Sequence, residues 1–92
     1  MSGLSLLAAL KAFDATARAG SMTAAARALA LQQPTVSAHI QRLEGEYGVE
    51  LFHRRGRRLE LTAFGRTLLD HTRRTFSGED DALALLNAAR NH

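Results

Sequence analysis

Four arginines lie within five residues, and their chemistry is the easiest in this sequence to interpret. Arg54, Arg55, Arg57 and Arg58 surround Gly56, and no acid interrupts them. A guanidinium is a planar fork that can donate two parallel hydrogen bonds to a phosphate or to the edge of a guanine. A solvated basic loop is the alternative, but like charges this close repel one another unless an anion lies between them. The cluster therefore favours a polyanionic partner.

Catalytic chemistry has little support in this sequence. The histidines are scattered at His39, His53, His71 and His92, and there is no cysteine. Neither His39 nor His53 has an acid or a cysteine at the spacing of a metal site or a catalytic triad. Gly56 lies between strand-like segments, whereas a phosphate loop would precede a helix. An enzyme is the first alternative class, but we expect no catalytic activity, no metal and no cofactor.

Length and composition limit the fold and the location. A chain of 92 residues without cysteine is expected to form one domain that lacks disulfides and cysteine-ligated zinc. The net charge is +3, and Lys11 is the only lysine, so nearly all the positive charge comes from arginine. No apolar run approaches the roughly 18 residues that span a membrane, and the first residues do not resemble a signal peptide. We expect a cytoplasmic protein with no membrane contact.

The stretch from Pro34 to Tyr47 is predicted to be a helix. Pro34 suits the first turn because it lacks an N–H, and Gly48 suits the end. Apolar residues recur at helical spacing and form a stripe that we expect to be buried, namely Val36, Ile40, Leu43 and Tyr47. The opposite face carries short or hydrogen-bonding side chains that could approach base edges, namely Pro34, Thr35, Ser37, Ala38, Gln41 and Arg42.

Two helices are predicted upstream. Leu4 to Arg18 is amphipathic, with Lys11, Asp14 and Arg18 expected outside. Its inward residues are Leu6, Leu7, Leu10, Phe13 and Ala17.

Gly20 ends this first helix, and Ser21 is a good N-cap for a short alanine-rich helix from Met22 to Leu29. Only three residues then precede Gln33, so the pattern indicates a helix-turn-helix. An ordinary pair of antiparallel helices is the alternative.

After Gly48 the spacing of apolar residues changes from the helical period to the alternation that is typical of strands. Leu51 and Phe52 precede a turn of Arg55, Gly56 and Arg57, and the next residues up to Leu61 alternate polar with apolar. This predicts a small hairpin with an arginine-rich tip beside the helix-turn-helix, which is a wing. Its arginines would enter a minor groove or contact phosphates.

Thr62 is predicted to cap a last helix that reaches about 40 Å if it continues to Ala89. Such a helix is longer than the rest of the domain can cover, so part of its apolar face should meet a second chain. The apolar residues assigned to that interface are Phe64, Leu68, Leu69, Phe76, Leu83 and Leu86. The alternative is a break at Ser77 and Gly78, with Glu79, Asp80 and Asp81 in the first turn of a separate helix.

The order of these residues resembles the N-terminal domain of LysR-type transcriptional regulators. The matching positions are Leu10, Phe13, Ala17, Ser21, Thr23, Ala25, Ala26, Leu29, Gln33, Pro34, Val36, Ser37, Ile40, Leu43, Glu44, Gly48, Leu51, Phe52, Arg54, Leu61, Thr62 and Gly65. The resemblance implies a winged helix-turn-helix, a long linker helix that pairs two chains, and a C-terminal domain that senses a small molecule. That last domain is absent from these residues, so a small-molecule effector would act only through a part not included here.

The resemblance also implies roles for individual residues. It implies that Gln33, Pro34, Thr35 and Ser37 read bases in the major groove, and Ala38 and Gln41, on the same helix face, complete the expected base-reading residues. It implies that Arg54 and Arg57 contact the DNA backbone or minor groove, and the other expected backbone and wing contacts are Ser21, Thr23, Arg27, Gln32, Arg42, Arg55 and Arg58. Two positions depart from the family pattern: Gln32 replaces the usual serine cap, and Ala38 replaces a common arginine. We therefore expect readout to depend more on Gln33, Gln41, Arg42 and the wing.

The predicted fold is mainly α, with a three-helix core and a two-stranded wing in residues 1–61 and a linker and dimerisation helix in residues 62–92. The predicted function is sequence-specific binding of double-stranded DNA by a homodimer on an inverted-repeat operator, at the bacterial nucleoid. Two alternatives stay open. A winged helix can bind protein instead of nucleic acid, and an architectural protein would bind any duplex equally.

Overall fold

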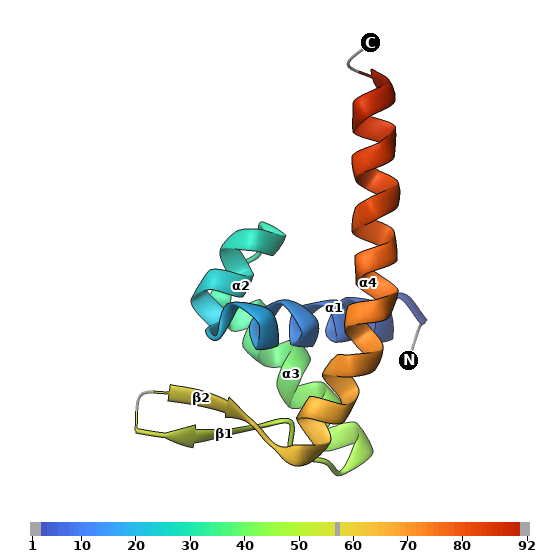
Figure 1. Ribbon diagram of the computed structural model, residues 1–92. Helices are drawn as coiled ribbons and strands as arrows, with labels where there is room; N and C mark the ends of the chain where they lie inside the picture. The colour runs from blue at the N-terminus through green and yellow to red at the C-terminus, as the bar shows by residue number, and fades with distance from the viewer. Residues whose placement is uncertain (1–2, 57, 91–92) are drawn as a thin grey trace.

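The chain folds in the predicted order of three helices, a hairpin and one long helix, as the computed structural model in Figure 1 shows. The structure describes residues 3–56 and 58–90. Its elements are α1 (Gly3–Ala19), α2 (Met22–Leu29), α3 (Gln33–Tyr47), β1 (Phe52–Arg55), β2 (Arg58–Leu61) and α4 (Ala63–Arg90). No helix in this described part is long and apolar enough to cross a membrane.

The corners between the first three helices follow from local chemistry. Gly20 takes a φ of +79°, which glycine adopts without strain, and the Ser21 hydroxyl oxygen accepts the Ala24 N–H at 3.0 Å. Ala30 ends α2 in the left-handed region, and Gln32 precedes α3 without a side-chain capping bond to the described chain. The α3 helix begins at Gln33, one residue before the predicted Pro34. Proline is tolerated there because N–H groups in the first turn have no intrahelical acceptor.

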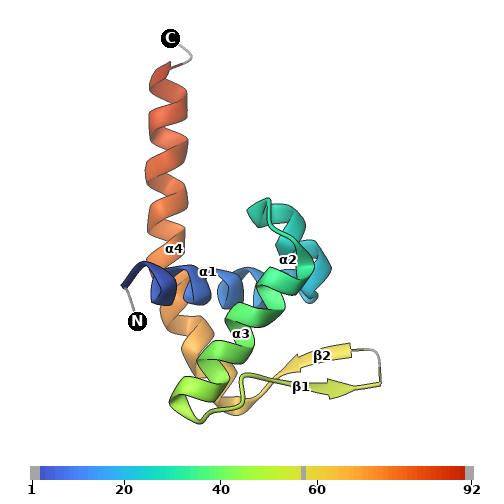
Figure 2. The same ribbon diagram turned by 180° about the vertical axis from the view of Figure 1, so that it is seen from behind.

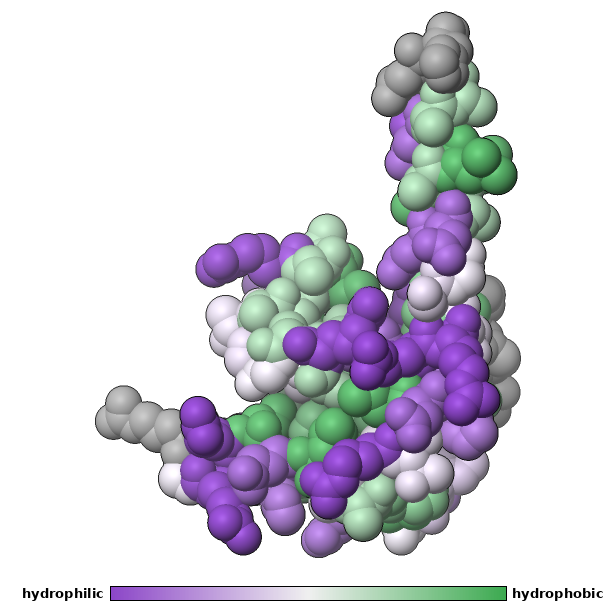
Figure 3. Space-filling model, viewed as in Figure 1, coloured by the Kyte–Doolittle hydropathy of each residue, from purple (hydrophilic) through white to green (hydrophobic). Residues whose placement is uncertain are grey.

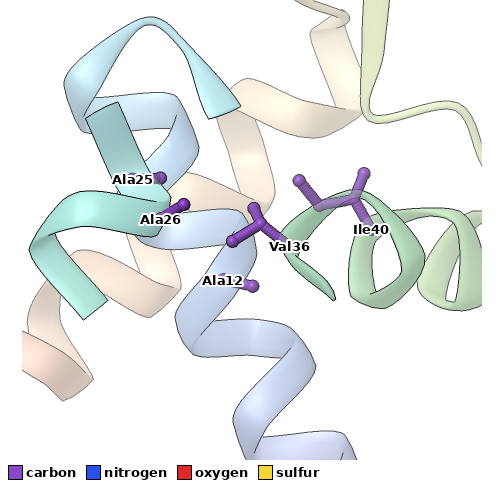
Figure 4. Packing of buried hydrophobic residues seen from close by; sticks show 5 residues of the cluster. All are labelled: Ala12, Ala25, Ala26, Val36 and Ile40. Atoms are coloured by element: carbon purple, nitrogen blue, oxygen red, sulfur yellow. The ribbon is translucent and has the colours of Figure 1, made fainter. Parts of the chain in front are cut away.

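Small residues let the three helices of the core approach closely. Figure 4 shows Ala12 of α1, Ala25 and Ala26 of α2, and Val36 and Ile40 of α3 packed together. Alanines on α1 and α2 leave little side-chain bulk between these helices, so the branched side chains of α3 fill the remaining space.

A second cluster connects α1 and α3 to the hairpin and α4. It contains Ala9, Phe13, Leu43 and Leu51, and Phe52 packs against both clusters. The rings of Phe13 and Phe52 are tilted at 48° with centroids 5.5 Å apart. The base of the hairpin is therefore part of the core.

Three predictions of burial were wrong. Tyr47 was expected to complete the buried stripe of α3, but it is 58% exposed, because in the last turn it lines an open apolar pocket with Leu6 and Leu10 of α1 instead of being covered by them. Leu7 is also exposed. Asp14 was expected outside, yet it is only 1% exposed because α4 crosses α1 at this point.

Polar side chains hold α4 against α1 at that crossing. The Thr72 hydroxyl donates to Asp14 Oδ1 at 2.8 Å, and Arg18 Nε lies 2.9 Å from Asp14 Oδ2. Lys11 pairs with Glu79 and lies 5.9 Å from the centroid of the Phe76 ring. The buried carboxylate of Asp14 is thus satisfied by two different helices.

The α4 helix is continuous through Gly78, as predicted. Thr62 caps it, because its hydroxyl oxygen accepts the Gly65 N–H at 2.9 Å. Glu79 does not begin a separate helix but pairs with Lys11 of α1. Figure 1 and Figure 2 show the C-terminal half of α4 projecting away from the other elements.

Gly65 brings the first turn of α4 into close contact with the residue before the hairpin. A Cβ on Gly65 would overlap the carbonyl oxygen of Leu51 and press on a Leu61 methyl group. Gly78, in the same helix, has no atom within 4 Å of the corresponding position. Position 65 therefore has no room for a side chain, whereas position 78 does.

We expect Gly65→Ala to lower the free energy of unfolding by about 1–3 kcal/mol, because backbone and core must shift to admit one methyl group. The measurement is urea unfolding at one fixed protein concentration. Gly78→Ala is the matched control and should raise stability by about 0.5–1 kcal/mol, because alanine is the better helix former. Equal stability of the two variants would contradict the close contact at Gly65.

Candidate nucleic-acid interface

The exposed side of α3 carries the side chains that the sequence assigned to base reading. Gln33, Pro34, Thr35, Ala38 and Gln41 are exposed, and Ser37 is half-buried. The buried side of the same helix holds Val36, Ile40 and Leu43 in the core, which fixes the direction in which the exposed side chains point. There is no acid from Gln33 to Leu43, so this surface does not repel a polyanion.

The N-terminal end of α2 lies beside the first turn of α3. Thr23 is exposed there, while Ser21 is half-buried and uses its hydroxyl oxygen to cap α2. The Gln33 side chain reaches back to this end, with Nε2 3.8 Å from Met22 Sδ. The helix N-terminus also carries partial positive charge from its unpaired N–H groups, which favours an anion.

The pairing of the two strands separates the arginines of the wing. Arg54 lies opposite Leu59, and Arg55 lies opposite Arg58. Because paired residues share a face and successive residues alternate, Arg54 and Arg55 point to opposite faces of the hairpin. We call them the inner face (Phe52, Arg54, Leu59 and Leu61) and the outer face (His53, Arg55, Arg58 and Glu60).

The inner face brings Arg54 to the helix-turn-helix. A hollow of about 200 Å³ is lined by Gly20, Ser21, Met22, Thr23, Gln33, Arg54 and Leu59. Four of the predicted contact residues, from α2, α3 and β1, thus surround one surface depression. Figure 1 and Figure 2 show α2 and the hairpin on the same side of the molecule, away from α4.

The predicted turn was one residue too long. Arg55 belongs to β1 and pairs with Arg58 of β2, so only Gly56 and Arg57 separate the strands in the sequence. Gly56 has a φ of +61°, which suits a tight hairpin connection. Arg57, one of the predicted wing contacts, lies outside the described residues. Arg27 and Arg42 are exposed on α2 and α3, as expected for phosphate contacts.

Glu44 has a structural role that the sequence reading missed. Its Oε2 accepts the backbone N–H groups of Leu51 at 2.8 Å and Phe52 at 3.4 Å, which ties the start of β1 to α3. A signal was present, because Glu44 follows the buried Ile40 by four residues and so lies beside the apolar stripe. An acid in that position needs a hydrogen-bond partner.

The residues assigned to dimerisation fall into three groups, which are exposed, half-buried and buried. Phe64, Leu83 and Leu86 are exposed, and so is Leu85, which the sequence reading omitted. Figure 3 shows hydrophobic side chains gathered on the projecting part of α4. Leu68 and Leu69 are half-buried against the second core cluster. Phe76 is a correction: it is 3% exposed beneath Lys11 of its own chain, so it is not available to a partner.

An apolar pocket lies near the base of α4. It has a volume of about 250 Å³ and is lined by Leu6, Leu10, Leu43, Tyr47, Val49, Leu51, Phe64 and Leu68. The exposed Tyr47 and Phe64 belong to this pocket, which gives both aromatic residues a common surface.

Comparisons with known proteins agree with this geometry. Residues 7–66 match the family described as bacterial regulatory helix-turn-helix proteins, lysR family. The uncharacterised HTH-type transcriptional regulator y4mQ of Sinorhizobium fredii is 47% identical over 70 residues, which are 76% of this chain and 24% of that protein. ClcR of Pseudomonas putida is 48% identical over 65 residues, covering 71% of this chain and 22% of that protein. The chain thus spans about a quarter of the length of these two relatives.

Complexes with DNA are among the similar solved structures. The DNA complex of the CbnR DNA-binding domain has a TM-score of 0.70 at 38% identity and covers 90% of this chain and 95% of that one. The complex of the BenM DNA-binding domain with catB site 1 DNA has a TM-score of 0.74 at 29% identity, covering 94% and 96%.

The Glu44 tie should be measurable. Glu44→Ala leaves two backbone N–H groups without their acceptor, so we expect a loss of about 1–3 kcal/mol in the free energy of unfolding. Amide hydrogen exchange at Leu51 and Phe52 should accelerate as well. Glu46→Ala, an exposed acid two residues on, is the control and should stay within about 0.5 kcal/mol of the wild type. Unchanged exchange at both amides would mean that the carboxylate does not anchor the wing.

Proposed function

The chain belongs to the LysR family of bacterial regulatory helix-turn-helix proteins, and on this premise we propose that it binds double-stranded DNA sequence-specifically to regulate transcription. The observation that carries the proposal is the hollow in which Ser21, Thr23, Gln33 and Arg54 meet beside the acid-free face of α3. The DNA complexes of similar domains support it.

In this proposal α3 enters the major groove with its N-terminal half foremost. Gln33 is well placed for reading because a carboxamide can make two hydrogen bonds to adenine. Thr35 and Gln41 add further donors and acceptors on the same exposed side, and the methyl group of Ala38 suits apolar contact with thymine. Ser37, half-buried, contributes only where its hydroxyl reaches the surface.

Phosphate contacts would come from the elements on both sides of α3. Thr23 and the N–H groups at the start of α2 face one strand of the duplex, and Arg54 approaches the same surface from the wing. Arg27 and Arg42 supply exposed positive charge nearby. Such contacts contribute most of the affinity and make it depend on salt, whereas base contacts select the sequence.

We further propose that two chains pair through antiparallel α4 helices. Leu83, Leu85 and Leu86 are exposed near one end of α4, and the apolar pocket with Phe64 lies near the other. Antiparallel pairing brings each chain's leucines over its partner's pocket, so both apolar surfaces are covered. A two-fold dimer of this kind matches an inverted-repeat operator.

The proposed role needs no catalytic group, metal or cofactor. A protein that binds chromosomal DNA would act in the bacterial cytoplasm, at the nucleoid.

Binding to an operator obtained by genomic site selection should be at least ~10³-fold tighter than binding to a scrambled duplex, and both affinities should fall steeply with salt. Gln33→Ala should weaken operator binding by about 1–3 kcal/mol and leave the scrambled duplex unaffected. Arg54→Ala should weaken binding to the operator and to the scrambled duplex and reduce the salt slope by about one. Arg74→Ala, which removes an arginine from α4, is the matched control and should leave both affinities and the slope unchanged. Fluorescence anisotropy of labelled duplexes measures all of these quantities.

Other outcomes of that experiment distinguish the alternatives. Equal affinity for the operator and the scrambled duplex would favour an architectural protein. Absence of binding to either duplex at low salt would rule out DNA binding and favour a winged helix that binds protein. If the Gln33→Ala variant still discriminates fully between the operator and the scrambled duplex, Gln33 is not a base-reading residue.

Leu86→Asp should convert the dimer into a monomer in sedimentation, because a buried unpaired carboxylate costs several kcal/mol and so raises the dissociation constant at least about 100-fold. Asn87→Asp adds the same charge at the next position and serves as the control. An unchanged dimer in Leu86→Asp would place the interface elsewhere on the chain.

A further inference from the structure

The outer face of the wing carries a single acid among basic residues. From Phe52 to Leu61 the sequence contains four arginines, one histidine and Glu60. Glu60 lies directly opposite His53 in the strand pairing, and Arg55 lies opposite Arg58. Arg55 and Glu60 are therefore diagonal neighbours on the same face.

The Glu60 carboxylate engages both neighbours on the opposite strand. Its Oε1 lies 3.2 Å from Arg55 Nε and 3.7 Å from His53 Nε2. Arg55 faces Arg58 directly across the hairpin, an arrangement in which like charges repel. The carboxylate therefore draws the Arg55 guanidinium along the strand, toward Glu60.

Arg54 and Arg55 lie on different surfaces of the wing. Arg54 lines the hollow next to α2 and α3, whereas Arg55 is on the opposite face, and its side chain is 78% exposed. In the proposed binding mode, a duplex seated on α3 and the hollow would contact Arg54. A duplex that lies on the wing alone, without α3 in its groove, can use Arg55. Charge on the outer face thus favours binding that does not depend on sequence.

We propose that Glu60 is a specificity-determining residue, which holds Arg55 along the outer face of the wing and thereby limits sequence-independent contact with phosphates. This inference rests on the proposed binding of DNA. It differs from a purely structural role, in which Glu60 would only offset the repulsion between Arg55 and Arg58 within the hairpin.

The test is a double-mutant cycle of Glu60→Gln and Arg55→Gln, with binding to operator and scrambled duplexes measured against salt. Glu60→Gln should bind the scrambled duplex about three- to tenfold tighter, with a salt slope steeper by about 0.9, the value for one added phosphate contact. Operator affinity should change less than about twofold, so the ratio of specific to non-specific affinity falls. In the Arg55→Gln background, the Glu60→Gln change should have no effect.

Asp81→Asn is the matched control, because it removes the same charge from an exposed position on α4. Amide chemical shifts of the two strands would show whether the hairpin of each variant is intact. Three results would overturn the inference. Glu60→Gln could raise the affinity for the scrambled duplex equally with and without Arg55, or Asp81→Asn could raise that affinity as much as Glu60→Gln does. The third is a Glu60→Gln variant whose hairpin is intact and whose affinity for the scrambled duplex is unchanged. In each of these the wild type still binds DNA, whereas a wild type that binds neither duplex refutes the proposed function itself.

Discussion

The backbone of Leu51 is the point at which the functional parts of this chain are joined. Its N–H donates to Glu44 of α3, and its carbonyl oxygen accepts the Thr62 N–H at 3.0 Å, just before α4. The same carbonyl lies against Gly65, and the Leu51 side chain is fully buried. One residue thus links α3, the wing and the long helix. A displacement of any of these elements would break one of these hydrogen bonds or open the core.

Features determined by near neighbours in the chain could be predicted from the sequence. Ser21 and Thr62 cap their helices because a hydroxyl three residues before an N–H can reach it in any protein. Val36 and Ile40 are buried because helical spacing places them on one face. Asp14 and Phe76 could not be placed this way, because their burial depends on where α4 crosses α1. The sequence of α1 does not specify that crossing, which joins residues 58 positions apart.

In the nucleic-acid interface, too, features set by near neighbours could be predicted and features set by distant parts of the chain could not. The exposed face of α3 follows from the helical period, so all the residues predicted for it except the half-buried Ser37 are exposed. The wing arginines looked equivalent in the sequence, because a charge cluster does not reveal strand pairing. Because Arg55 belongs to β1 rather than to the turn, it alternates with Arg54, and the two side chains point to opposite faces. Glu44 was missed for a related reason: its partners are backbone groups that the composition of a segment cannot show.

The buried pair of Asp14 and Thr72 has a mechanical consequence. The carboxylate is satisfied only when Thr72 faces it, so sliding or rotating α4 by one turn would leave a buried charge short of a partner. The α4 helix therefore leaves the body in one fixed direction and acts as a rigid rod. In the proposed dimer, the two α4 helices would hold the two α3 helices at a fixed distance from each other. DNA with differently spaced half-sites would then have to bend or twist to fit the protein.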